Sequence, residues 1–159
     1  MKRYDGHFIV NYDIPALLHK NSAQTDIFSM IIRSFLPYPR FHGLINIINH
    51  ALEEAEIVSE PGLYSHVFHY SKGPFEQILD GAGYVYEEGG RHLPPAQLSF
   101  FSYLLAAGIE EGEVFRALRD PIMRFRMKDG TEQERHLLEY TYEASFTEAV
   151  EKFRSMTGR

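Results

Sequence analysis

The sequence contains no cysteine and no tryptophan. Without cysteine the chain cannot form disulfides, use a thiolate nucleophile or bind a metal through thiolates. This absence is typical of proteins in a reducing compartment, and we predict a cytoplasmic location. Large side chains are supplied instead by 12 Phe and 10 Tyr residues, which predict a core built largely from aromatic rings.

Long apolar runs are also missing. No stretch approaches the ~20 consecutive apolar residues that a transmembrane helix needs, and no apolar run of a signal peptide follows the basic residues near the N-terminus. A net charge of −6 gives the chain no general attraction to nucleic acids or anionic membranes. We therefore expect no membrane contact, and nucleic acid is disfavoured as a partner.

The common catalytic signatures are absent as well. The chain has no GxSxG nucleophile turn, no GxxxxGK[ST] or GxGxxG phosphate loop and no HExxH metal motif. The sequence therefore predicts no catalytic residue and no cofactor, and it favours a protein without enzymatic activity. Acid–base pairs assembled in space from distant residues would leave no such signature.

The composition is that of one globular domain spanning residues 1–159. Hydrophobic residues make up 44% and charged residues 24% of the chain, and no repeat or linker interrupts it. Helical and strand patterns occur in mixed order, without regular βαβ alternation. We predict an α+β fold with about five helices packed on a small, mostly antiparallel sheet, and with a C-terminal β-hairpin (122–142) followed by a final helix.

Apolar spacing and capping residues place the expected elements along the chain. Helices are expected over 21–36, 40–56, 73–83, 95–107 and 110–119, and again after Ser145, which forms a capping box with Glu148. Strands are expected over 6–14 and 63–73, and a short strand with a turn over 84–93. The short link between the first two helices predicts that they are neighbours in space.

The hairpin over 122–142 alternates apolar and basic residues on its first strand. Met123, Phe125 and Met127 share one face, and Arg124, Arg126 and Lys128 share the other. A two-residue turn at 129–130 would set Phe125 against Glu134, whereas a longer loop sets it against Leu138 or Tyr140. We predict the longer loop, which also brings the arginines close to Glu139.

A winged-helix DNA-binding protein using residues 95–142 is the first alternative. Helices 95–107 and 110–119 followed by the hairpin have the order of that fold. Its candidate nucleic-acid contacts are Arg116, Arg119, Arg124, Arg126 and Lys128. Glutamates at the start of the second helix and on the return strand oppose a polyanion. We therefore favour a hairpin whose charges neutralise one another over a DNA-binding wing.

A metal-dependent enzyme using His66 and His69 is the second alternative. On a helix, two histidines three positions apart share a face and can bind one metal ion. On a strand, which we favour for 63–73, they point to opposite faces. The sequence therefore predicts no metal site, and its eight histidines are expected to pack among aromatic rings.

The aromatic-rich stretch 64–86 is the candidate for a small-ligand pocket. Its candidate lining residues are Tyr64, His66, Phe68, Tyr70, Tyr84 and Tyr86. Rings with polar tips often line apolar pockets, but the same residues can form a core between a sheet and its covering helices. We favour the core, and keep this stretch as the first place to look for a ligand.

The leading functional prediction is a small regulatory or adaptor module that binds a partner protein or an apolar small ligand. It rests on the missing catalytic motifs, the acidic charge and the aromatic-rich middle of the chain. Self-association into a homodimer is a further expectation, because Phe28, Ile32 and Leu36 widen the apolar surface of the first helix beyond what one neighbour covers.

Overall fold

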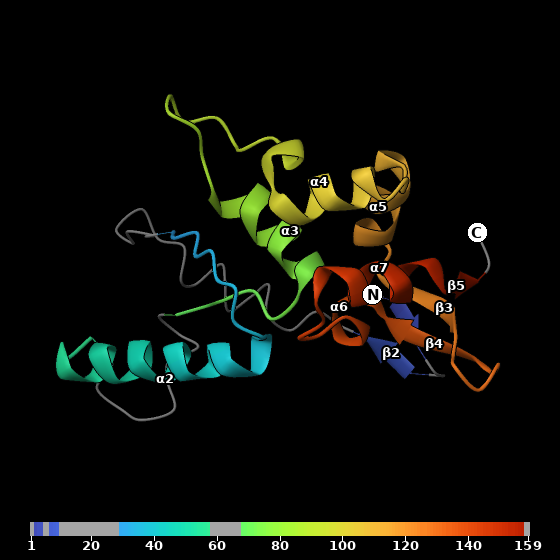
Figure 1. Ribbon diagram of the computed structural model, residues 1–159, viewed down its shortest axis with the longest axis horizontal. Coiled ribbons are helices and arrows are strands. Elements are labelled where there is room, and N and C mark those ends of the chain that lie inside the picture. Colours follow the sequence, from blue (N-terminus) through green and yellow to red (C-terminus); the bar gives the residue numbers. More distant parts are fainter. Residues whose placement is uncertain (1, 5–6, 10–28, 58–67, 158–159) are drawn as a thin grey trace.

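The computed structural model describes residues 2–4, 7–9, 29–57 and 68–157 (Figure 1). Its elements, in chain order, are β1 (Lys2–Tyr4), β2 (His7–Ile9), α2 (Tyr38–Glu54), α3 (Pro74–Tyr84), a 3₁₀ helix (Pro95–Gln97), α4 (Ser99–Ala106), α5 (Glu111–Arg119), β3 (Ile122–Arg126), β4 (Glu132–His136), α6 (Leu137–Tyr140), α7 (Phe146–Arg154) and β5 (Met156–Thr157). Strands β4, β3 and β5 form a three-stranded antiparallel sheet, and β1 pairs with β2. With six α-helices in the described part, the predicted α+β class is confirmed.

The main hydrophobic core lies within residues 75–156, and its largest fully buried side chains are five phenylalanines, although aliphatic residues outnumber them. Phe75 at the start of α3 is fully buried, and its ring packs edge-on against Phe100 of α4, with centroids 5.0 Å apart. It also packs against Phe153 of α7, at 5.2 Å. Phe125 of β3 and Leu137 of α6 are fully buried as well, and α5 contributes Val114, so one core joins five helices to the sheet. Within the described ranges, no helix combines the length and the apolar character needed to cross a bilayer.

Local sequence signals account for the helix boundaries. Helix α3 begins at Pro74, whose fixed φ suits the first helical position, directly after the extended Gly73. Just beyond the end of α4, Gly108 takes a positive φ of 81°, as is common after a helix C-terminus. At α7, the Ser145 hydroxyl accepts a hydrogen bond from the Glu148 N–H while the Glu148 carboxylate accepts one from the Ser145 N–H, so the predicted capping box is confirmed.

The hairpin of β3 and β4 closes more tightly than predicted. Its register places Phe125 opposite Gln133, and the paired strand ends at His136. Leu138 and Tyr140 therefore lie in α6 instead of on a strand. The expected long loop and its register are wrong.

The chemistry of the loop, residues 128–130, explains this register. Gly130 adopts a φ of 83°, the left-handed conformation that closes a three-residue hairpin loop. The Asp129 carboxylate accepts hydrogen bonds from the backbone N–H and the hydroxyl of Thr131, at 3.0 and 2.7 Å. Local turn chemistry thus outweighs the apolar alternation of the return strand, and the core receives Leu137 from a helical turn.

The structure also describes parts of three further predicted elements, and two of these parts are irregular. The helix predicted over 21–36 is wrong for residues 29–36, which form no regular secondary structure; residues 21–28 lie outside the described ranges. Residues 68–73 of the strand predicted over 63–73 are likewise irregular, and 63–67 lie outside those ranges. Of the strand predicted over 6–14, His7–Ile9 form β2, and the other residues lie outside the described ranges. The absence of a helix over 29–36 has a physical reason. Helices in proteins are stabilised mainly by packing of an apolar face, and the side chains of 30–36 are exposed.

Helix α2 lies beside the body of the protein, by which we mean residues 68–157, and not within its core (Figure 1). Among the described side chains of α2 only Ile45 is buried, with 8% exposed. Two polar contacts near its N-terminal end join it to the body. The Tyr38 hydroxyl donates to the Ser71 carbonyl oxygen, and the His42 ring pairs with the Glu143 carboxylate. We call these four residues the α2 anchor.

Gly73 lies where the start of α3 meets the turn after α6, and we predict that it tolerates no side chain. A Cβ there would lie 2.7 Å from the backbone oxygen of Thr141, a residue that is fully buried. Because backbone cannot move aside cheaply, Gly73→Ala should lower the free energy of unfolding by about 1–3 kcal/mol in urea titrations. Gly83→Ala is the matched control, because nothing lies within 4 Å of its Cβ position and it is helical. Equal stability of the two variants would contradict the prediction.

Candidate functional site

Helix α2 carries an exposed stripe of side chains that is separate from its covered one. The covered stripe consists of Phe41, Ile45, Ile48 and Leu52, all buried or half-buried. The second stripe, which we call the α2 stripe, consists of Arg40, Leu44, Ile47, Ala51 and Glu54. At 3.6 residues per turn the two stripes lie roughly 110° apart around the helix axis. Leu44 is half-buried and the other four residues of the α2 stripe are exposed, Ile47 by 67%.

The spacing of the α2 stripe is that of helices that pair. Its members follow one another at alternate steps of four and three residues, so they form a straight seam along the helix, as in a coiled coil. Gly43 borders this seam, and nothing lies within 4 Å of where its Cβ would be. A second helix could therefore approach α2 closely at this point.

The charges of α2 are placed unfavourably for an isolated helix. Its first turn has no acidic residue and its last turn no basic one; instead Arg40 lies near its N-terminal end and Glu53 and Glu54 lie at its C-terminal end. The partial positive charge at a helix N-terminus favours anions, and the negative C-terminus favours cations, by about 0.3–1 kcal/mol per group. Both ends of α2 thus carry the wrong sign.

The segment that enters α2 adds apolar surface. Five large apolar side chains of residues 30–36 are exposed, Phe35 by 96%; they are Met30, Ile31, Ile32, Phe35 and Leu36. The segment leads directly into the N-terminal end of the helix (Figure 1). Contiguous apolar surface of this kind marks interaction sites in soluble proteins.

A polar cluster of different character lies at the start of α3. The His69 Nε2 atom lies 3.0 Å from Oδ2 of Asp80, and the Ser71 hydroxyl donates to the same oxygen at 2.6 Å. Glu76, one turn before Asp80 on α3, completes a group whose carboxylate and imidazole ligand atoms all lie within 4.8 Å of one another. We call His69, Glu76 and Asp80 the His69 cluster.

The α2 anchor adjoins the His69 cluster, because Ser71 belongs to one and contacts the other. Burial raises the pKa of Tyr38, and the nearby Glu76 raises it further, so its hydroxyl stays protonated and donates. The hydrogen bond from His42 lowers the pKa of Glu143. Glu143 adopts a φ of 54°, which is uncommon for a residue other than glycine, and its N–H donates to the Lys72 carbonyl at 2.9 Å.

The described members of the predicted aromatic pocket form two separate ring pairs. Phe68 and Tyr70 precede α3 and stack on each other at 5.9 Å, and Tyr84 lies at the end of that helix. Tyr86 is exposed and packs on His92 at 4.4 Å. The other two candidates, Tyr64 and His66, lie outside the described ranges. His69 contacts Asp80 of α3, and the spacing between His66 and His69 does not reveal this contact.

Two of the basic residues considered for nucleic-acid contact, Arg124 and Arg126, lie beside acidic residues. Arg126 lies 3.9 Å from Glu132, and Arg124 stands opposite Glu134 in the hairpin register. These glutamates belong to β4. Glu139, which was expected close to the arginines, lies in α6. Arg116 and Arg119 lie in the last turn of α5, where their positive charges interact favourably with the negative end of the helix dipole. Lys128 lies in the hairpin loop.

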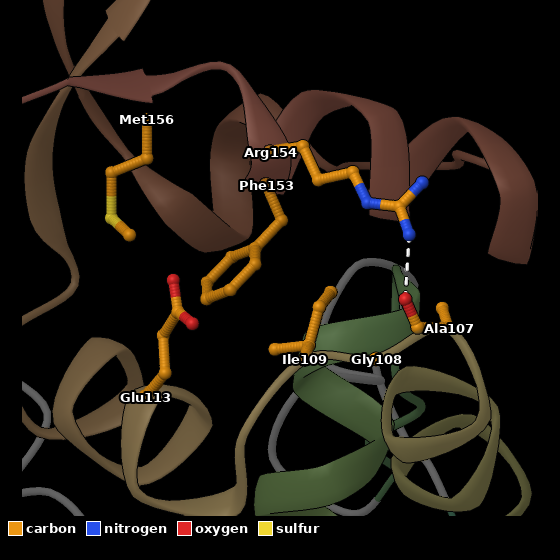
Figure 2. A pocket seen from close by; sticks show the side chains of 7 residues that line it. All are labelled: Ala107, Gly108, Ile109, Glu113, Phe153, Arg154 and Met156. Carbon is orange, nitrogen blue, oxygen red and sulfur yellow. Dashed lines mark hydrogen bonds between the residues drawn. The ribbon is translucent and has the colours of Figure 1, made fainter.

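A shallow hollow of about 180 Å³ lies where α4, α5 and α7 meet (Figure 2). Its lining residues are Ala107, Gly108, Ile109, Glu113, Phe153, Arg154 and Met156. The Arg154 guanidinium donates to the Ala107 carbonyl at 2.6 Å and so caps the C-terminal end of α4. The hollow is smaller than the roughly 300 Å³ of small ligand pockets, and Arg154 has a structural role in it.

We predict that His69 holds its proton to higher pH than an ordinary histidine. The hydrogen bond to Asp80 raises the pKa of His69 above 6.5, so the pair stabilises the fold fully below that pH and loses its contribution as pH rises through the folded-state pKa. Burial lowers the pKa of His136, which serves as a reference in the same experiment. An NMR titration of metal-free protein should give the higher pKa for His69, and Asp80→Asn should lower it. A His69 pKa below that of His136 would contradict this.

Comparison with protein-family models, with curated proteins and with solved structures finds no match to this chain.

Proposed function

We propose that the protein is a protein-interaction module of the regulatory or adaptor kind, and that its partner at α2 is a second copy of the same chain. The observation that carries this proposal is the self-complementary order of charges and apolar groups along the α2 stripe. The stripe begins with a cation, ends with an anion and has exposed Ile47 at its centre.

An antiparallel arrangement of two copies satisfies the whole stripe at once. Arg40 and Glu54 are equidistant in sequence from Ile47. A two-fold axis at Ile47 therefore brings Arg40 of each copy to Glu54 of the other, and brings Leu44 close to Ala51. Such an interface is isologous, the commonest type in homodimers, because the same patch serves on both subunits.

The same arrangement corrects the unfavourable charges of α2. Beside an antiparallel partner, Arg40 lies next to the negative C-terminal end of the other helix, and Glu54 next to its positive N-terminal end. The macrodipoles of the two α2 helices also point in opposite directions, so their interaction is attractive. Arg40 and Glu54, whose charges destabilise a lone α2, would thus stabilise the pair.

The exposed segment 30–36 extends the apolar part of this interface. It precedes the first residue of α2, so in the antiparallel pair it lies nearest the C-terminal end of the other helix. Ile57 is exposed just beyond that end, by 58%. This apolar surface would add to the three apolar residues of the stripe. A stable interface needs on the order of 1,200 Å² of buried surface.

The alternative functions have less support in the described residues. A DNA-binding wing needs free cations, whereas Arg124 and Arg126 face glutamates of β4. A pocket for an apolar ligand needs enclosed rings, whereas Tyr84 and Tyr86 are exposed, by 44% and 53%. We therefore prefer protein binding to the other two.

Charge reversal tests the antiparallel pair directly. Arg40→Glu or Glu54→Arg should each raise the dimer dissociation constant about tenfold over that of the wild type, because two symmetry-related attractive contacts become repulsive. An equimolar mixture of the two variants should dimerise as well as the wild type, because each mutated position then faces an opposite charge. Sedimentation velocity over a concentration series measures this against the 18.4 kDa of one chain.

Glu53→Arg is the matched control for this experiment. It makes the same change of charge in the same last turn of α2, but Glu53 lies off the α2 stripe. Its dimer should be as strong as that of the wild type. A wild-type protein that stays monomeric throughout the series, or a mixture no stronger than its two components, would overturn the proposal.

A further inference from the structure

We propose that His69, Glu76 and Asp80 form a binding site for one zinc-class divalent cation. This site is distinct from the dimer interface and does not depend on it. The three residues offer one imidazole nitrogen and two carboxylates, and all three ligand atoms lie within 4.8 Å of one another. The donors come from two parts of the chain, since His69 precedes α3 while Glu76 and Asp80 lie on it.

The geometry requires only a small closure around an ion. Zinc lies about 2.0–2.2 Å from imidazole and carboxylate ligands, so ligand atoms in a tetrahedral site lie roughly 3.4 Å apart. His69 Nε2 and Asp80 Oδ2 are already 3.0 Å apart. Glu76 lies one helical turn from Asp80, on the same face of α3, and its ligand atom lies within 4.8 Å of the other two.

Both carboxylates are held in place by donors outside the set of ligands. The Ser71 hydroxyl donates to Asp80 at 2.6 Å, and the Lys72 backbone N–H donates to Glu76 at 2.6 Å. Ser71 is fixed in turn, because its carbonyl accepts from the Tyr38 hydroxyl. Hydrogen bonds of this kind orient metal ligands and commonly change metal affinity by about 10–100-fold when removed.

The donor set selects the metal. An imidazole ligand favours zinc and its neighbours in the first transition row over magnesium and calcium, which prefer oxygen alone. Two carboxylates balance the charge of a divalent ion when the imidazole is neutral. His69 is 56% exposed and Asp80 23%, so an ion can enter from solvent, and three protein ligands leave at least one position for water or for a donor atom of a bound molecule.

Calorimetric titration of the metal-free 159-residue chain with zinc chloride tests the site. We expect one equivalent to bind, and we expect His69→Ala and Asp80→Asn each to weaken binding at least tenfold. Ser71→Ala should weaken it by about tenfold without removing a ligand. Millimolar magnesium chloride should not compete.

His50→Ala is the matched control, because His50 also lies near two carboxylates, at 3.7 Å from Glu53 and 3.4 Å from Glu54. General attraction of zinc to surface histidines would use that group equally, so the control should bind as the wild type does. Circular dichroism establishes that each variant is folded. Repeating the titration on Arg40→Glu separates the site from the dimer interface, since that variant should still bind one zinc.

Two results would overturn the proposal. If His69→Ala binds zinc as tightly as the wild type, His69 and Asp80 form an ion pair only. If His50→Ala loses the binding instead, the zinc site lies on α2. Substitution of cobalt for zinc gives a second readout, because an absorption band from a nitrogen and oxygen ligand set should appear in the wild type and be lost in His69→Ala.

Discussion

Among the described residues, two polar contacts join α2 to the body near the N-terminal end of the helix, and this constraint underlies its proposed role. The Tyr38 hydroxyl and the His42 ring reach two acceptors of the body, while the main core contains no residue of α2. These contacts and the burial of the covered stripe leave another side of the helix uncovered. The α2 stripe therefore stays exposed, and its charges oppose the helix dipole until another helix lies beside them.

The body, in contrast, is organised by buried aromatic packing. Phe75 contacts Phe100 and Phe153, and so ties the first turn of α3 to α4 and α7. That packing also fixes the position of Glu76 and Asp80, which follow Phe75 on α3. The residues that precede α3 are drawn onto the same helix by Ser71 and Lys72. The His69 cluster thus has a rigid half on α3 and a hydrogen-bonded half before it.

Elements governed by local chemistry could be predicted from the sequence. Helix α7 was predictable because Ser145 and Glu148 form a capping box within one turn, and α3 because a proline begins it. The register of the hairpin was missed because the apolar alternation through Leu138 and Tyr140 outweighed a glycine turn in the prediction, whereas the turn at Gly130 decides it. Residues 29–36 have helical spacing but no cover, and they are not helical.

The candidate sites depend on contacts that spacing alone does not reveal. His69 meets Asp80 across eleven residues and the start of a helix. Apolar spacing alone points to the covered stripe of α2, and only the exposure of Ile47 in the structure identifies a second stripe. β5 was missed because two residues after α7 carry no strand pattern, yet they pair with β3.

The absence of native cysteine makes one measurement especially direct. Ile47→Cys would place a single thiol on the proposed two-fold axis, next to its copy in the second chain. We predict that mild oxidation links this variant rapidly into covalent dimers, whereas Asn46→Cys, an exposed position away from the α2 stripe, stays largely unlinked. Equal cross-linking of the two variants, or none in either, would contradict the antiparallel pairing of α2.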